Sequence, residues 1–379
     1  MKFRQIIKAI VPFKLSIIIS NIFSRNILNI FKRKFDYFDI RENSVLLIEF
    51  YKVHGESLPG HAKYFLDLNY NIDVVINCKG KNDIGLFSCF NTNKKVRVKI
   101  LSDYDMNYLM RSPVISNYKH IMINSLDNKC ELNHLAFVNL FKLKPVCAIH
   151  NPNLLSKYFK TNKIISHVKI ESKNRKSPVI VNPHYFCDYR RRERKCENSN
   201  ITTFTAFNNN DLLRRNINLL FNACDMLYEK GISNFNIKVI GKGLPILDCF
   251  NKNIQNFGFL DFQSMYKEII DSDFFIALLD EESKQYTNKA SGSYQISYGF
   301  LKPLLLHSQF SKISYLNNDN SILYDSNGNL AEAMERCINM TNNEYLSIVN
   351  SLEKTKNDLY NVSLKNFKEV LEAPLELIK

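Results

Sequence analysis

Short runs of apolar residues recur along the chain, and longer stretches with the spacing of amphipathic helices separate them. The runs are rich in β-branched residues and are bounded by polar turns, which is typical of strands that a parallel sheet buries on both faces. In the first half the predicted strands are NSVLLIEF, NIDVVIN (71–77), VRVKIL (96–101), HIMIN (120–124), KPVCAIH (144–150) and SPVIVNPHYF (177–186). Because strand and helix patterns alternate, the sequence predicts an α/β fold.

A second series of the same kind follows the basic stretch DYRRRERKCENSN (188–200), which is predicted to be a linker. Its predicted strands are ITTFTAF (201–207), NFNIKVIGKG (234–243), DFFIALLD (273–280) and KPLLLH, and its predicted helices include RRNINLLFNACDMLYEKG (214–231), DFQSMYKEIIDS (261–272) and SGSYQISYGF. A chain of 379 residues is too long for one typical core. We therefore expect two Rossmann-like domains facing a cleft, 35–187 and 201–342, with C-terminal helices over 343–379. Ligands of such sheets bind outside the carboxyl ends of the strands.

The first 34 residues carry eight basic side chains and no acidic one, interleaved with Ile, Leu and Phe. The longest uncharged run, 15–24, is about half of the roughly 20 residues that span a bilayer. We expect this basic amphipathic segment to lie on an anionic membrane surface, where each basic residue contributes about 1 kcal/mol. The alternative is an ordinary helix that packs its apolar face on the first domain.

The net charge of +14 indicates an anionic partner, such as nucleic acid, anionic lipid or a phosphorylated small molecule. Because the charge is concentrated in the N-terminal segment and the linker, and no nucleic-acid module is recognisable, we expect no nucleic-acid partner. The nine cysteines form no CxxC pair, and no cleavable secretory signal precedes the first domain. These observations predict reduced thiols and a cytoplasmic location.

Between residues 201 and 310 the chain carries, in order, NNNDLLRRNINLL, LYEKGISNFNIKVIGKG, NIQNFGFLDFQSMYKEIIDSDFFIALL and SGSYQISYGFLKPLLLH. Their order and spacing resemble the donor half of GT-B glycosyltransferases, most of all family 4-like enzymes of bacterial surface polysaccharide synthesis. HGESLPGHAKYFLDLNYNIDVVI resembles the first βαβ unit of the other half. The resemblance implies transfer of a sugar from a nucleotide-sugar donor to a lipid-linked or growing glycan of the O-antigen, lipopolysaccharide or capsule type, without a metal or other cofactor.

The sequence departs from this family at one position. Many retaining members carry two glutamates eight positions apart before the last helix of the donor site. Here Glu281 and Glu282 are followed, eight positions later, by Lys289 and Ala290. Whether the enzyme retains or inverts the configuration of the sugar is therefore left open.

Ser291, Gly292 and Ser293 begin a predicted helix. The free N–H groups and the positive end of the helix dipole suit a diphosphate, and Gly292 lets the backbone approach the ligand. An ordinary serine N-cap would give the same local sequence.

Two further segments of the second series are candidates for binding the donor substrate. Arg215, with Arg214 beside it, could neutralise the charge that develops on the leaving nucleoside diphosphate. Gly241, Lys242 and Gly243 follow a strand and could form a tight turn near the base or ribose. A solvated helix start and an ordinary glycine turn are the simpler interpretations.

A sugar hydroxyl is a poor nucleophile, so an inverting transfer needs a general base beside it. His54 or Glu56, in the loop after the first strand, fits this need, and Pro59 with Gly60 is expected to shape a turn toward the phosphates. The alternative is that Glu56 caps the following helix and that His54 is an ordinary loop residue.

His150 and His184 lie toward the ends of predicted strands and are weaker candidates, either structural or on the acceptor side. The patterns Asp103–Asp105 and Asp271–Asp273 resemble metal-binding carboxylate pairs. The second pair lies at the amino end of a strand, the wrong edge for a ligand, whereas the first pair follows a strand and is less easily dismissed. We therefore expect no metal. The sequence as a whole predicts a glycosyltransferase on the cytoplasmic face of the plasma membrane; a nucleic-acid-binding protein and an inactive scaffold of the same fold are the alternatives.

Overall fold

The computed structural model describes residues 39–50, 55–77, 85–126, 134–149, 163–169, 178–184, 200–208, 215–241, 253–287 and 289–373. The chain divides into two compact units, 1–42 and 43–379, and the description below concerns the second. The basic segment 1–34 and nearly all of the predicted linker lie outside the described residues. No helix among the described residues is long and apolar enough to cross a membrane.

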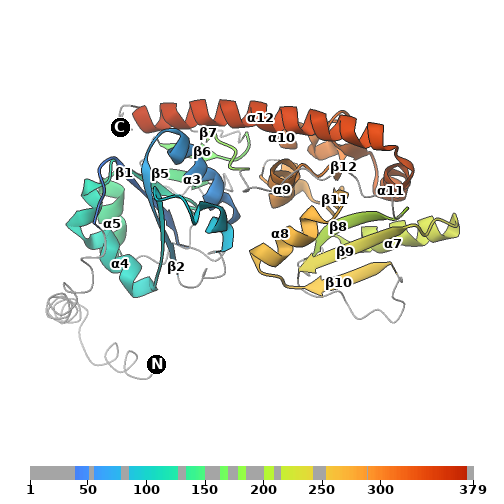
Figure 1. The fold of residues 1–379 in the computed structure, drawn as a ribbon, viewed down its shortest axis with the longest axis horizontal. Coiled ribbons are helices and arrows are strands. Elements are labelled where there is room, and N and C mark those ends of the chain that lie inside the picture. Colours follow the sequence, from blue (N-terminus) through green and yellow to red (C-terminus); the bar gives the residue numbers. More distant parts are fainter. Residues whose placement is uncertain are drawn as a thin grey trace, which may run out of the picture. The chain divides into compact units, whose positions relative to one another are not determined.

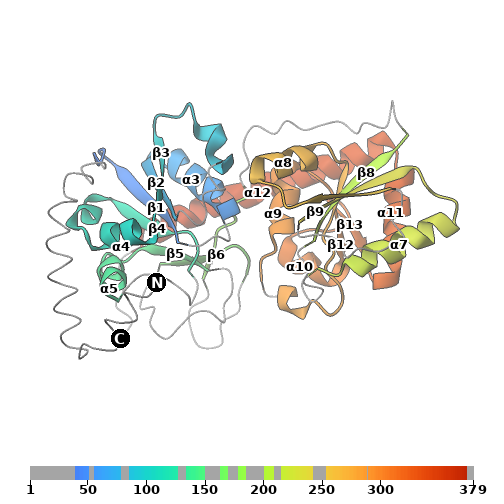
Figure 2. The same cartoon turned by 90° about the horizontal axis from the view of Figure 1, so that it is seen from below.

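The first sheet has seven strands in the order β3-β2-β1-β4-β5-β6-β7, all parallel. They are β1 (Ser44–Glu49), β2 (Asn71–Asn77), β3 (Val96–Leu101), β4 (His120–Ile123), β5 (Val146–Ile149), β6 (Ile164–Ser166) and β7 (Val179–Ile180). In register, Leu47 of β1 lies between Val74 of β2 and Met122 of β4. The helix α3 (Leu58–Asp67) covers one face of this sheet, and α4 (Asp103–Arg111) and α5 (His134–Lys142) cover the other (Figures 1 and 2).

The second sheet has six parallel strands in the order β10-β9-β8-β11-β12-β13. They are β8 (Thr202–Asn208), β9 (Phe235–Gly241), β10 (Ile254–Gly258), β11 (Phe274–Ile276), β12 (Leu304–His307) and β13 (Ile322–Tyr324). Its helices are α7 (Ile217–Glu229), α8 (Phe262–Ile270), α9 (Gly292–Phe300), α10 (Ser311–Ser314) and α11 (Leu330–Asn339). Short 3-10 helices lie at Gly55–Ser57, Pro113–Asn117, Lys284–Thr287, Ser308–Phe310 and Asn327–Asn329.

Both sheets confirm the predicted α/β fold of two Rossmann-like halves. The apolar run 45–48 of β1 is fully buried, as a strand covered on both faces must be. VRVKIL, by contrast, becomes the edge strand β3, whose residues are only partly buried because it has one neighbour in the sheet. In each sheet the strand order reverses once, between β1 and β4 and between β8 and β11. The carboxyl ends at such a reversal are where ligands of open α/β sheets bind.

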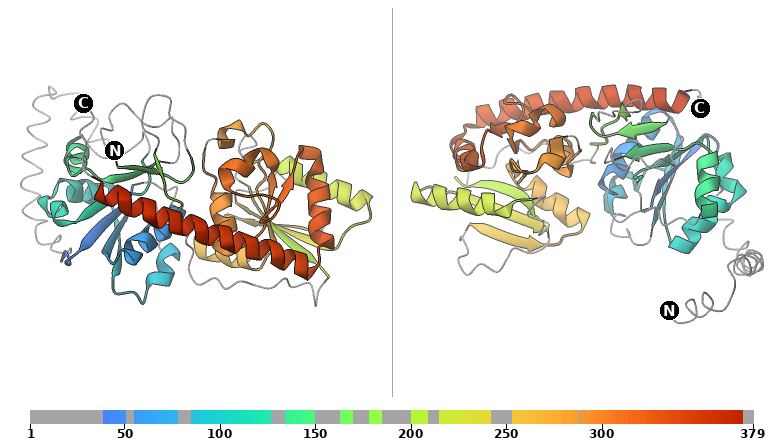
Figure 3. Two further views of the ribbon diagram at one scale, coloured as in Figure 1. Left: turned by 90° about the horizontal axis from the view of Figure 1, so that it is seen from above. Right: turned by 180° about the vertical axis from the view of Figure 1, so that it is seen from behind.

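The last helix, α12 (Asn342–Glu372), packs on elements of both sheets (Figures 1 and 3). It begins at a capping box in which Thr341 and Glu344 satisfy each other's backbone N–H groups. It contacts α9 beside the second sheet and β6 and β7 of the first. Phe367 of this helix packs edge-on against Phe65 of α3, with ring centres 4.8 Å apart. The predicted C-terminal helices are therefore largely one helix, which joins the two halves.

The cysteines follow the prediction only in part. Cys147, Cys224 and Cys337 are buried and free. Cys89 is disulfide-bonded, so the expectation of reduced thiols throughout is wrong at this position. A disulfide requires only that two Cβ atoms come within about 4 Å of each other, and the spacing of cysteines in the sequence does not reveal that proximity.

Candidate functional site

A hollow of about 120 Å³ lies at the carboxyl ends of strands from both sheets. Its lining residues follow β1, β6, β7 and β8 or surround the start of α9, so both points of strand-order reversal contribute to it. They are Glu56, Ser57, His167, Pro183, Arg215, Tyr286, Lys289, Ala290, Ser291, Gly292 and Gln295. Of the residues predicted for the site, four line this hollow: Glu56, Arg215, Ser291 and Gly292. Lys289 and Ala290, named in the prediction only because they stand where a second glutamate was expected, line it as well.

Arg215 is the buried cation of the hollow, with 9% of its surface exposed. Its Nη1 donates to the carbonyl oxygen of Ala277, at the end of β11, over 2.8 Å. Its Nη2 donates to the hydroxyl oxygens of Ser291 and Ser293, over 3.1 and 3.0 Å. These three acceptors are neutral oxygens, and they position the guanidinium beside the hollow.

The start of α9 forms the adjacent wall. Ser291 is the N-cap, and its side chain accepts a hydrogen bond from the backbone N–H of Ser293. A Cβ atom built on Gly292 would meet nothing within 4 Å, so the helix start is open in front of this residue. Gly292 therefore has no packing role in the described structure, and its missing side chain leaves room for a ligand at the positive end of the helix.

Two further residues, Tyr286 and Gln295, complete the donor side of the hollow, and the sequence analysis did not assign them a role there. Tyr286 is buried, and its ring lies 5.7 Å from the guanidinium carbon of Arg215 and 5.9 Å from Nζ of Lys289. Gln295, on the first turns of α9, is also buried and lines the hollow. Gln295 could have been suspected, because it is the one amide side chain of α9 and lies three residues after Gly292. With two cations and one carboxylate, from Glu56, the lining suits an anion.

On the other side, a buried polar network fixes the segment that carries Glu56. Ser57 Oγ and His61 Nδ1 both donate to Oδ1 of Asn124, over 3.0 and 2.7 Å. Nδ2 of Asn124 donates to the carboxylate of Glu49, the last residue of β1, over 2.5 Å. His61 donates from Nδ1, so Nε2 carries its lone pair, and burial lowers the pKa of His61 to about 4. The neutral ring therefore holds the start of α3 in place near neutral pH.

Of the two candidates for the general base, only Glu56 lies within the described residues. Glu56 lies in the 3-10 turn Gly55–Ser57 and lines the hollow, partly exposed. His54 lies outside the described residues, as do the predicted residues Arg214, Lys242, Gly243 and His150. The choice between Glu56 and His54 stays a prediction.

The Pro-Gly turn predicted after Glu56 is wrong. Pro59 and Gly60 lie in the first turn of α3, where a proline is tolerated because the N–H it lacks would have no partner in the helix. A Cβ atom on Gly60 would lie 2.3 Å from the carbonyl oxygen of Pro183. Gly60 is thus required for the close approach of α3 to the segment after β7, and it does not shape a phosphate loop.

His184 and Gly241 also differ from their predicted roles. His184 is buried, and its ring packs 5.5 Å from that of Tyr298 and 6.3 Å from that of Tyr360, so it does not face an acceptor. Burial lowers its pKa to about 3. Gly241 has φ of +132°, and a Cβ atom there would lie 1.7 Å from the carbonyl oxygen of Asn208, so this glycine is needed where β9 ends against β8.

The aspartates of the two predicted acidic patterns form hydrogen bonds within the fold. Asp103 accepts a hydrogen bond from Asn77, and Asp105 accepts one from Ser102, the N-cap of α4. Asp273 accepts a hydrogen bond from the N–H of Thr203 at the amino ends of the strands, as its position predicted. Among the described residues, no group of three or more His, Cys, Asp or Glu side chains could hold a metal ion.

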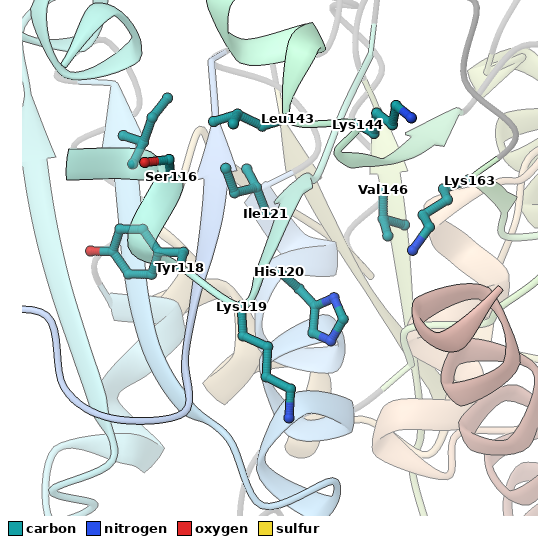
Figure 4. A pocket seen from close by; sticks show the side chains of 10 residues that line it. Ser116, Tyr118, Lys119, His120, Ile121, Leu143, Lys144, Val146 and Lys163 are labelled. Atoms are coloured by element: carbon teal, nitrogen blue, oxygen red, sulfur yellow. The ribbon is translucent and has the colours of Figure 1, made fainter. Parts of the chain in front are cut away.

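A second hollow, of about 240 Å³, lies at the opposite edge of the first sheet, where β4, β5 and β6 begin (Figure 4). It is lined by Ile115, Ser116, Tyr118, Lys119, His120, Ile121, Leu143, Lys144, Val146 and Lys163. Nζ of Lys163 donates to the carbonyl of Leu371 in the last turn of α12, over 2.8 Å, and Nζ of Lys119 donates to Asn43 over 3.2 Å. Burial, with the charges of these two lysines, lowers the pKa of His120 to about 4. These contacts hold chain segments together at the edge away from the strand carboxyl ends.

The fold is that of GT-B glycosyltransferases. A glycosyltransferase from Rickettsia africae ESF-5 matches with a TM-score of 0.56 and 14% identity, covering 88% of this chain and 100% of that one. An alpha-glucosyltransferase in complex with UDP and a 13-mer DNA matches with a TM-score of 0.56 and 9% identity, covering 87% and 99%. A Listeria monocytogenes protein assigned as a UDP-N-acetylglucosamine 2-epimerase matches with a TM-score of 0.55 and 11% identity, covering 88% and 97%. No protein-family model and no curated protein matches the sequence.

Substitution by alanine is expected to have opposite effects on stability at Gly292 and at Gly241. Gly292→Ala should leave the thermal unfolding temperature unchanged or slightly higher, because alanine is the better helix former and its Cβ meets open space. It should nevertheless weaken binding of a nucleoside diphosphate, which has to approach this backbone.

Gly241→Ala should instead destabilise the fold, since its Cβ would overlap the Asn208 carbonyl at a backbone angle that alanine rarely adopts. Calorimetry of folding and of UDP binding for both variants checks this. Equal loss of stability in the two variants would contradict the roles assigned to these glycines.

Proposed function

We propose that this chain is a glycosyltransferase that moves a sugar from a nucleotide-sugar donor to a lipid-linked or growing bacterial surface glycan. One observation carries the proposal: a buried guanidinium, held by neutral oxygens, faces a hollow beside an open helix start. A buried cation is stabilised by an anion that binds to it, and a diphosphate also satisfies the N–H groups of the helix start. The GT-B fold supports the proposal, since one structure of this fold is that of a glucosyltransferase with UDP.

In the proposed reaction, Arg215 and Lys289 bind the diphosphate of the donor at the start of α9. The carboxylate of Glu56 accepts the proton of the acceptor hydroxyl while that oxygen forms a bond to the anomeric carbon. The bond from this carbon to the diphosphate breaks, and the electron pair leaves with the diphosphate. Positive groups aimed at the leaving oxygens stabilise the charge that develops there, typically by several kcal/mol.

Three alternatives predict different outcomes. An epimerase of the same fold would change the configuration of the sugar without an acceptor. A nucleic-acid-binding protein would bind duplexes with a steep salt dependence and would not turn over a nucleotide sugar. An inactive scaffold would bind a nucleotide without turnover. Product analysis by NMR after incubation with nucleotide sugars, with and without lipid-linked acceptors, distinguishes all three from the proposed transfer.

Arg215→Gln should reduce the affinity for UDP by at least about tenfold, because a charge-assisted hydrogen bond contributes about 1.5–3 kcal/mol. Arg336→Gln is the matched control, since Arg336 is exposed on α11 and lies outside the hollow. Titration calorimetry measures both affinities, and circular dichroism verifies folding. Arg215→Lys keeps the charge and serves where the glutamine variant is unstable. Wild-type affinity in both variants of Arg215 would refute the assignment.

Glu56→Gln should lower kcat by about 10²–10⁴-fold at saturating donor, with nearly unchanged affinity for the nucleotide, because the carboxylate acts on the acceptor. Glu369→Gln is the control, an exposed glutamate on α12 outside the hollow. His54→Ala tests the second candidate. If His54 is the base, kcat of the wild-type enzyme should fall below about pH 6.5, the usual pKa of a histidine. If Glu56→Gln retains turnover within a few-fold, Glu56 is not the base.

The same proposal places the protein on the inner face of the plasma membrane through the basic segment 1–34. Deleting this segment should release the chain from vesicles rich in anionic lipid while leaving nucleotide binding intact, since the described residues that line the hollow all lie between Glu56 and Gln295. A variant with the eight basic residues changed to glutamine separates the electrostatic contribution from the apolar one. Flotation that is unchanged by the deletion would show that another surface binds the vesicles.

A further inference from the structure

Gln295 is a buried amide without a hydrogen-bond partner in the described structure. Only 6% of its surface is exposed, and both Nε2 and Oε1 are buried and unpaired. Buried side-chain polar atoms are nearly always hydrogen-bonded, because leaving one unpaired typically carries a free-energy penalty. An amide with both atoms unpaired in the wall of a hollow therefore indicates that its partner is a ligand.

Gln295 and the open helix start belong to the same wall of the hollow. Gln295 lies three residues after Gly292, so both belong to one helix face. Side chains of a helix lean toward its N-terminus, and Gln295 lines the hollow together with Ser291 and Gly292. The amide thus belongs to the wall that carries Ser291, one of the two serines that hold Arg215.

The chemistry of an amide restricts the partner. Nε2 donates and Oε1 accepts, so full pairing requires a ligand group or groups that both accept and donate. The oxygens of an ionised diphosphate only accept and would leave Oε1 unpaired. A hydroxyl group does both, and in a nucleotide sugar hydroxyls flank the diphosphate on either side, on the ribose and on the transferred sugar.

We infer that Gln295 is a specificity residue that binds a hydroxyl of the donor substrate next to its diphosphate. The inference rests on the proposed function and deepens it: the site would select a hydroxylated diphosphate ester over an inorganic or nucleic-acid phosphate. A site that pairs with a hydroxyl discriminates strongly against a ligand that lacks it, because the buried polar groups are then left unpaired.

The test compares the wild-type chain with Gln295→Met, which keeps the volume and removes both polar atoms. Gln263→Met is the matched control, since Gln263 is exposed on α8 and lies outside the hollow. Titration calorimetry with pyrophosphate, UDP, 2′,3′-dideoxy-UDP and UDP-glucose measures the affinities, and the unfolding temperature of each ligand-free variant is recorded.

We expect Gln295→Met to bind pyrophosphate within twofold of wild type and to lose about 10–100-fold in affinity for the hydroxylated ligand. A loss with UDP that disappears with dideoxy-UDP assigns the ribose hydroxyls, and a loss confined to UDP-glucose assigns the transferred sugar. The unfolding temperature of the ligand-free variant should equal or exceed that of wild type, because no hydrogen bond within the protein is removed.

Other results overturn the inference. An equal loss for all four ligands would mean that Gln295 only shapes the diphosphate site, and an equal loss for UDP and dideoxy-UDP, with UDP-glucose no more affected, would assign the nucleobase. Wild-type affinities of Gln295→Met for all four ligands would refute the role of Gln295 and leave the proposed function standing. Failure of the wild-type chain to bind any of the nucleotides would refute the proposed function itself, and the inference with it.

Discussion

The contact between Arg215 and the first turn of α9 is the interaction on which the organisation of the second sheet's carboxyl edge depends. One guanidinium joins the loop after β8, the end of β11 and the helix start at Ser291. These three segments meet where the strand order reverses, a place that no strand covers. The guanidinium thus lies at the carboxyl edge of the sheet, the edge at which open α/β sheets bind their ligands.

The first sheet supplies the opposite wall of the hollow through a buried hydrogen-bond network. Its reversal point, between β1 and β4, is filled by the amide of Asn124, which connects Glu49 to Ser57 and His61. The network contains a neutral histidine and a carboxylate, so it orders the segment of Glu56 without placing a positive charge there. The two halves of the hollow consequently differ in kind: one presents the cations Arg215 and Lys289, and the other presents the carboxylate of Glu56.

Sequence patterns predicted the features that depend on local chemistry. Strands with both faces buried have continuous apolar runs, so β1 and β8 could be predicted from the sequence. A serine followed by glycine likewise predicted the start of α9. Features that depend on distant contacts were not. Pro59 and Gly60 resemble a turn, yet Gly60 is small because Pro183, far along the chain, packs against it. The pairing of Asn124 with Ser57 and the orientation of Gln295 depend in the same way on contacts that only the folded chain brings together.

The packing of α12 has a consequence for the order in which the protein forms. Phe65 and Tyr64 of α3, near the beginning of the first sheet, contact Phe367 and Tyr360, near the end of the chain. A ribosome adding roughly 5–20 residues per second needs about 15–60 s to make the 300 or so residues between them. Throughout that time the aromatic side chains of α3 lack their final cover. The nascent first half therefore exposes this aromatic surface until α12 has been synthesised.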